Sequence, residues 1–167
     1  MASQVPESDP ILLGLSFGGM IAIEMAKHIK VKKVILVSAV KTRNEIPSWM
    51  RLAGKLRLHK IIPVKSNRLT EKADDRRMGI ETKGEKDYVD TYRKNADQAY
   101  LSWAIDKILT WKNTWVPSET FHIHGEQDRM FPLKNISATH VIKGGTHIMI
   151  LNRAVEIGRC IEGILLA

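Results

Sequence analysis

Four short apolar runs along the chain have the pattern of buried strands. They are residues 10–15, 32–40, 119–125 and 138–144. Each run is nearly continuously apolar, which is typical of parallel strands that are covered on both faces. Helical periodicity follows the first run from Phe17 to Ile29 and the last run from Ile150 to Leu166. This alternation of strand and helix predicts an α/β fold, with a mostly parallel sheet flanked by helices.

The segment at residues 41–118 is much longer than the roughly dozen residues that a parallel crossover requires. Its periodicity predicts helices over 47–59, 68–79, 85–96 and 97–112. We therefore expect two units: a core formed by residues 1–40 and 119–167, and a mostly helical cap formed by residues 41–118 at the carboxyl ends of the strands. The charged block 68–87 is interpreted as a solvated face or a loop, and not as a binding site.

The charge of the chain is positive but evenly spread. Lys and Arg number 26 against 18 Asp and Glu, which gives a formal net charge of +8. Such a balance could attract a polyanion, but no zinc-finger spacing and no aromatic RNA-binding signature accompany these residues. We therefore predict a generally basic surface and no nucleic-acid partner.

The apolar segments and the cysteine content bear on location and cofactors. No segment approaches the roughly eighteen apolar residues of a membrane span, and "MASQVPESDP" lacks the basic start and apolar core of a signal peptide. These features predict no membrane partner and a cytoplasmic location. Cys160 is the only cysteine, so it can form neither an internal disulfide nor a thiolate cluster, and its apolar neighbours predict a small buried hydrophobe. We expect neither a metal nor another cofactor.

A serine stands at the junction between the first strand and the first helix. In Gly14-Leu15-Ser16-Phe17-Gly18, glycines two positions before and two positions after the serine would relieve the crowding of a sharp turn, and Gly19 would give further room. Such a turn lifts the hydroxyl above the strand ends and lets the backbone N–H of Phe17 face a developing oxyanion. The alternative is a glycine-rich turn with an ordinary N-cap serine.

A nucleophilic serine needs a base, and the base needs a group that orients it. Asp128 and His147 each follow the end of an apolar run, and the carboxyl ends of parallel strands meet at the edge of the sheet where ligands bind. Taken singly, Asp128 could be a turn residue and His147 a cap or surface residue. Glu126 is an alternative acid, although it lies closer to the strand end. The histidines inside the strand patterns are predicted to be packing residues: His122, His124 and His140.

Together these three motifs resemble the α/β-hydrolase family. "GLSFGG" is similar to its nucleophile elbow, "HGEQDRMFP" to its acid loop and "GGTH" to its histidine loop. The resemblance covers most of the chain. It implies that Ser16 is the nucleophile, that His147 is the general base and then acid, and that Asp128 orients the imidazole. It also implies that Phe17 donates one oxyanion N–H.

The activity implied by this resemblance is that of a serine esterase, which hydrolyses a small-molecule ester or thioester through an acyl-enzyme. The alternative is a catalytically silent hydrolase-fold module used for binding or assembly. Trp49 and Tyr100 are candidates for a pocket under the cap, with core packing as the favoured role of each. Core packing is also the favoured role of the residues that could contact the substrate: Met20, Trp103, Met130, Phe131 and Met149.

Family members usually have several strands and an oxyanion loop before the elbow, whereas only "MASQVPESDP" comes before the elbow strand here. Three explanations remain open: the C-terminal portion of a longer hydrolase, a short form that pairs with a second copy, or a remnant used for binding. The first strand would then lie at a sheet edge, with no charge from Ile11 to Leu15. We therefore expect association through this edge, as a homodimer or with a missing N-terminal portion.

Overall fold

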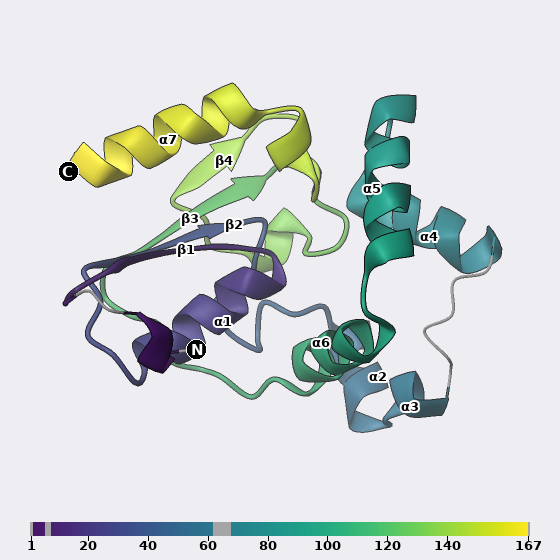
Figure 1. Ribbon diagram of the computed structural model, residues 1–167, viewed down its shortest axis with the longest axis horizontal. Coiled ribbons are helices and arrows are strands. Elements are labelled where there is room, and N and C mark those ends of the chain that lie inside the picture. The colour runs from purple at the N-terminus through teal and green to yellow at the C-terminus, as the bar shows by residue number, and fades with distance from the viewer. Residues whose placement is uncertain (1, 6–7, 62–67, 167) are drawn as a thin grey trace.

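A parallel sheet forms the centre of the structure, a computed structural model that describes residues 2–5, 8–61 and 68–166. Within these residues the sheet is four-stranded, in the order β1-β2-β3-β4, and every neighbouring pair is parallel. The strands are β1 (Ile11–Leu15), β2 (Lys33–Val37), β3 (Thr120–Gly125) and β4 (His140–Ile142). The helix α1 (Phe17–Ala26) covers one face of the sheet and α7 (Ala154–Leu166) covers the other (Figure 1). The predicted α/β class is confirmed.

Some elements are shorter than the sequence pattern predicts. The second strand ends at Val37, because Ser38 leaves the strand with a φ of 47°. The last helix begins at Ala154 instead of Ile150, after a short 3₁₀ turn, η3 (Met149–Leu151). Two further 3₁₀ turns are η1 (Ala2–Gln4) and η2 (Leu133–Asn135).

The long segment between β2 and β3 forms a group of helices at the carboxyl ends of the strands, the side to which the arrowheads point in Figure 1. They are α2 (Ser48–Lys55), α3 (Leu58–Ile61), α4 (Arg68–Met78), α5 (Lys83–Asn95) and α6 (Gln98–Thr110). Where the pattern predicts one helix over 47–59, the chain bends at Arg57, with a φ of 53°, and forms two. The charged block 68–87 is largely helical, and Asp75 of α4 pairs with Arg93 of α5 at 2.7 Å. Nowhere in the described ranges is a helix both long enough and apolar enough to cross a membrane.

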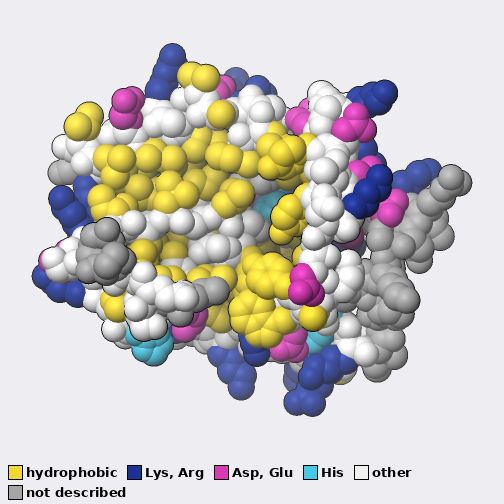
Figure 2. Space-filling view, viewed as in Figure 1, with side chains coloured by type: hydrophobic (Ala, Val, Ile, Leu, Met, Phe, Trp, Pro, Cys, Tyr) yellow, Lys and Arg dark blue, Asp and Glu magenta, His cyan; other side chains and the backbone are white. Residues whose placement is uncertain are grey.

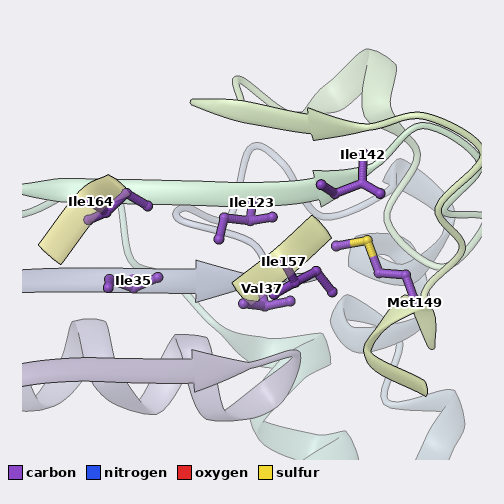
Figure 3. Close-up of a cluster of buried hydrophobic side chains, with 7 residues drawn as sticks. All are labelled: Ile35, Val37, Ile123, Ile142, Met149, Ile157 and Ile164. Atoms are coloured by element: carbon purple, nitrogen blue, oxygen red, sulfur yellow. The ribbon is translucent and has the colours of Figure 1, made fainter. Parts of the chain in front are cut away.

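Alternation along β2 divides the core between the two faces of the sheet. Val34 and Leu36 pack toward α1, whereas Ile35 and Val37 pack toward α7. Because β2 is buried on both faces, its apolar run is nearly continuous. Cys160 lies at the margin of the α7 side and is half-buried, which corrects the expectation of a buried cysteine. Figure 3 shows the buried residues of this cluster: Ile35, Val37, Ile123, Ile142, Met149, Ile157 and Ile164.

One face of β1, the edge strand, is open. Leu12 packs toward α1, whereas Ile11, Leu13 and Leu15 point to the opposite face and are 38–54% exposed. On that face α7 packs against β3 and β4, at the far side of the sheet from β1. Figure 2 shows hydrophobic side chains gathered over the region of the sheet and α7. Within the described residues, β1 therefore has one backbone edge that pairs with no other strand, and one exposed apolar face.

We predict that the chain associates through the β1 edge at micromolar concentration, because pairing would satisfy the edge N–H and C=O groups and cover Leu13. Leu13→Glu places a charge on the open face and should shift the mass measured by size-exclusion chromatography with light scattering toward that of a monomer. Leu52→Glu makes the same change on α2, where Leu52 is 56% exposed, and should leave the mass unchanged. A stable monomer of the unaltered chain would contradict this prediction.

Candidate active site

Ser16 lies in a strained turn between β1 and α1. Its φ of 51° and ψ of −118° fall outside the regions that non-glycine residues favour, at a cost on the order of 1–3 kcal/mol. Two hydrogen bonds hold this conformation. The Ser16 N–H donates to the carbonyl of Val37 at 2.9 Å, and the Gly19 N–H donates to the carbonyl of Ser16 at 3.0 Å. The turn therefore holds Ser16 at the carboxyl end of the sheet.

Two glycines make room for this turn. A Cβ atom on Gly14 would lie 2.5 Å from the carbonyl carbon of Gly18, and one on Gly19 would lie 2.6 Å from the Cβ of Ala39. A Cβ atom on Gly18 would have nothing within 4 Å. The close approach of β1, α1 and β2 thus requires Gly14 and Gly19, and the role expected for Gly18 is corrected.

Gly14→Ala should lower the free energy of unfolding by about 1–3 kcal/mol, the usual effect of overpacking, because the new methyl group meets the backbone of α1. Gly18→Ala is the matched control. It lies in α1 with open space around it and should be neutral or stabilising, since Ala is favoured over Gly in a helix by up to about 1 kcal/mol. Urea unfolding followed by circular dichroism compares the two variants. Equal destabilisation would show that Gly14 does not constrain the turn.

Three side chains from separate loops form a continuous chain of hydrogen bonds. The hydroxyl of Ser16 lies 3.0 Å from Nε2 of His147, and Nδ1 of His147 lies 2.9 Å from Oδ2 of Asp128. Asp128 and His147 are buried, with 3% and 7% of their surface exposed. Because a carboxylate can only accept, Nδ1 of a neutral imidazole carries the proton and Nε2 accepts from the serine hydroxyl. The sequence-predicted trio is therefore brought together, in the tautomer that lets His147 take a proton from Ser16.

Backbone groups of the loop after β3 fix the orientation of the Asp128 carboxylate. Its Oδ1 accepts backbone N–H groups of Met130 and Phe131, both at 2.8 Å, so that Oδ2 is turned toward His147. The Phe131 ring meets the imidazole edge-on, with centroids 5.4 Å apart. The loop also contacts the one that carries His147, because the Gln127 N–H donates to the carbonyl of Gly145 at 2.8 Å. Asp128 is thus positioned by its own loop and by the neighbouring one.

The alternative acid, Glu126, has a different partner. It is exposed and accepts the backbone N–H of Gly144 at 2.9 Å. The structure therefore places Asp128, and not Glu126, beside the imidazole of His147. The histidines predicted as packing residues lie in strands: His122 and His124 in β3, and His140 at the start of β4.

The candidates for substrate contact fall into two groups. One group belongs to the cluster that also contacts Phe17: Met20, Met130 and Phe131. Trp103 of α6 joins this group, since its ring meets that of Phe17 edge-on with centroids 5.5 Å apart. Met149 is separate, because it is fully buried in the cluster beneath α7. Phe17 opens α1, so its N–H has no partner within the helix and is available as a donor.

The two remaining aromatic candidates lie on the helices between β2 and β3. Tyr100 lies beside Trp103, with ring centroids 5.9 Å apart. Trp49 of α2 lies against the guanidinium of Arg77, at 4.9 Å from the ring centroid. Both are about half exposed, so neither belongs to the buried core. Over the part of the chain that the structure describes, no group of His, Cys, Asp and Glu has the arrangement of a metal site.

No family model matches the sequence, and no curated protein matches it either. Solved structures do match. A thermophilic esterase from Thermogutta terrifontis aligns with a TM-score of 0.68 and 14% identity, over 95% of this chain and 65% of the esterase. The 2-hydroxy-6-oxo-6-phenylhexa-2,4-dienoate hydrolase of Rhodococcus sp. strain RHA1 aligns with a TM-score of 0.63 and 18% identity, over 96% of this chain and 65% of the hydrolase. A bromoperoxidase from Bacillus anthracis aligns with a TM-score of 0.58 and 16% identity, over 99% of this chain and 70% of the bromoperoxidase.

At these identities the similarity establishes the fold alone. The chain spans 65% of the length of the esterase and of the hydrolase, so it corresponds to part of their structures. The matched part includes almost all of this chain, with its parallel sheet and the helices between β2 and β3. The chain therefore has the α/β-hydrolase fold.

Proposed function

We propose that this chain is a serine hydrolase that cleaves an ester or thioester of a small molecule through an acyl-enzyme. The observation that carries the proposal is the chain of hydrogen bonds from Ser16 through His147 to Asp128, at 3.0 and 2.9 Å. A strained serine with a base and an orienting carboxylate is the arrangement that nucleophilic catalysis requires. The similarity to an esterase and to another hydrolase supports the choice of reaction class.

The proposed reaction has two halves. In the first, Oγ of Ser16 attacks the acyl carbon while Nε2 of His147 takes the hydroxyl proton, and Asp128 stabilises the imidazolium. The tetrahedral oxyanion collapses, the alcohol or thiol leaves with the proton from His147, and the acyl group remains on Ser16. In the second half His147 removes a proton from water, which attacks the acyl-enzyme. The acid leaves and Ser16 regains its proton.

The oxyanion would be stabilised by the N–H of Phe17 at the N-terminus of α1, where the helix dipole adds to the effect. We assign this one donor. A site with one donor in place of two has a barrier higher by about 2.7–4 kcal/mol, so slow turnover is expected unless a partner or a further segment supplies the second. The helices α2–α6 would act as a cap, with Trp103 at 43% exposure offering an apolar contact near Phe17.

Labelling with a fluorophosphonate probe tests the nucleophile. The wild-type chain should be labelled once, and Ser16→Ala should not be labelled. Ser38→Ala is a matched control, because Ser38 also follows a strand and also has a positive φ. Unlike Ser16, Ser38 is fully buried, and its hydroxyl has no partner within the described residues. This variant should be labelled like the wild type. Labelling that persists in Ser16→Ala would refute the assignment, and a folded chain without any labelling or ester turnover would favour the non-catalytic binding module.

A further inference from the structure

The corner between α4 and α5 contacts the segment that carries His147. The carbonyl of Met78 accepts the N–H of Ile148 at 3.3 Å. Gly79, with a φ of 74°, lies so close to Thr146 that a Cβ atom would be 2.5 Å from the Cβ of Thr146. The end of α4 therefore contacts Thr146 and Ile148, the residues on either side of His147 in the sequence.

A third contact joins α5 to the same segment. The side-chain amide of Asn152 donates to Oε1 of Glu85 at 2.6 Å, between residues 67 positions apart. Glu85 is 7% exposed. Its other oxygen, Oε2, accepts the N–H groups of Glu81 at 2.8 Å and Thr82 at 3.0 Å. Burial raises the pKa of Glu85, but these hydrogen bonds together hold the pKa below its ordinary value. The carboxylate is thus ionised and held in place, and charge-assisted hydrogen bonds are roughly twice as strong as neutral ones.

Asn152 and His147 belong to one hydrogen-bonded unit. The N–H of Asn152 donates to the carbonyl of Met149, and the N–H of Met149 donates to the carbonyl of Thr146, each at 3.2 Å. These bonds tie Asn152 to Thr146, the residue before His147, so we expect a displacement at Asn152 to shift His147 as well. On its other side the segment is held by the loop of Asp128, through the carbonyl of Gly145.

We propose that Glu85 and Asn152 are positioning residues for His147. The proposal rests on the proposed function, since it concerns the base of that reaction. The corner between α4 and α5 holds the turn at 146–153 so that Nε2 of His147 stays at 3.0 Å from the hydroxyl of Ser16. Loss of the Glu85–Asn152 bond lets the turn relax, which lengthens this hydrogen bond and slows proton transfer from Ser16.

Two substitutions separate positioning from stability. Asn152→Ala removes the bond to Glu85 and leaves the capping box of α5, in which the Glu85 N–H donates to the Thr82 hydroxyl at 3.2 Å. Thr82→Ala removes this cap and leaves the bond to Asn152. The rate constant of fluorophosphonate labelling should fall at least tenfold in Asn152→Ala and by less than twofold in Thr82→Ala, although the thermal midpoint falls in both. Equal labelling rates in the two variants would overturn the proposal.

A second readout does not depend on activity. In a Ser16→Ala background, the NMR resonances of the His147 ring, including its Nδ1 proton bonded to Asp128, report the position of the imidazole. They should shift or broaden on adding Asn152→Ala and stay unchanged on adding Thr82→Ala. Unchanged resonances in both variants would overturn the positioning role. Failure of the wild type to react with the probe, combined with shifted resonances in the Asn152 variant, would refute the proposed function while supporting the positioning of His147.

Discussion

Asp128→Asn should lower kcat/KM for ester hydrolysis by about 10⁴-fold while leaving the fold intact. The amide oxygen can still accept the N–H groups of Met130 and Phe131, which Oδ1 accepts at 2.8 Å in the wild type. The amide nitrogen then faces Nδ1 of His147 in place of Oδ2. Since two N–H donors cannot face each other, the imidazole proton moves to Nε2, where the ring can no longer accept the proton of Ser16.

Glu126→Gln is the matched control for this substitution. It makes the same change two residues earlier, in a carboxylate whose partner is the N–H of Gly144, and it should change kcat/KM by less than a few fold. Initial rates on a p-nitrophenyl ester, with thermal unfolding by circular dichroism to check the fold, compare the two variants. Loss of activity in Glu126→Gln, with activity kept in Asp128→Asn, would reverse the assignment of the acid.

Acid should unfold the protein through two buried histidines in β3. His122 and His124 are completely buried, with Nε2 of His122 at 3.2 Å from Nδ1 of His124 and Nε2 of His124 at 2.8 Å from the carbonyl of Phe131. A carbonyl only accepts, so each ring donates from Nε2 and the pair is neutral. Burial, with a contribution from the charges of His124 and Lys41, lowers the pKa of His122 from 6.5 to about 3. Burial also lowers the pKa of His124.

The sign of the effect follows from the lowered pKa. Below pH 6.5 the unfolded chain binds a proton at His122 while the folded chain does not, so stability is full above pH 6.5 and is lost as the pH falls toward about 3. The loss from His122 is up to about 1.4 kcal/mol per pH unit, and the lowered pKa of His124 adds to it in the same direction. Over two pH units this approaches a large part of the total stability of a small domain.

Urea unfolding between pH 7 and pH 4 measures this slope. His122→Gln keeps a nitrogen donor toward His124 without a titrating ring, so it should be less stable at pH 7 but lose stability less steeply in acid. His28→Gln removes an exposed histidine and should have the slope of the wild type. The same slope in His122→Gln as in the wild type would contradict this account.

The proximity of the three candidate site residues could be predicted from the sequence. Ser16, Asp128 and His147 each follow a strand pattern, and parallel strands bring their carboxyl ends to one edge, so their proximity follows from topology without knowledge of packing. The buried positions of His122 and His124 followed likewise from the apolar pattern of β3.

Contacts between distant segments could not be predicted in this way. The sequence left Glu126 open as an alternative to Asp128, and only the structure shows that the loop after β3 turns a carboxylate oxygen of Asp128 toward His147. It also assigned Gly18 to the crowded turn, whereas the structure leaves open space there and requires only Gly14 and Gly19, which were also expected to give room.

The sequence by itself determined the α/β class, the placement of the candidate site residues just after strands, and the helical content between β2 and β3, because these depend on local periodicity and turn chemistry. Only the tertiary structure decided the separation of Met149 from the other apolar candidates and the bond between Glu85 and Asn152. "TKGE" at 82–85 is a capping-box pattern that predicts the start of α5. No local pattern predicts that Oε1 of Glu85 binds Asn152, because this contact depends on how α5 packs against a turn 67 positions away.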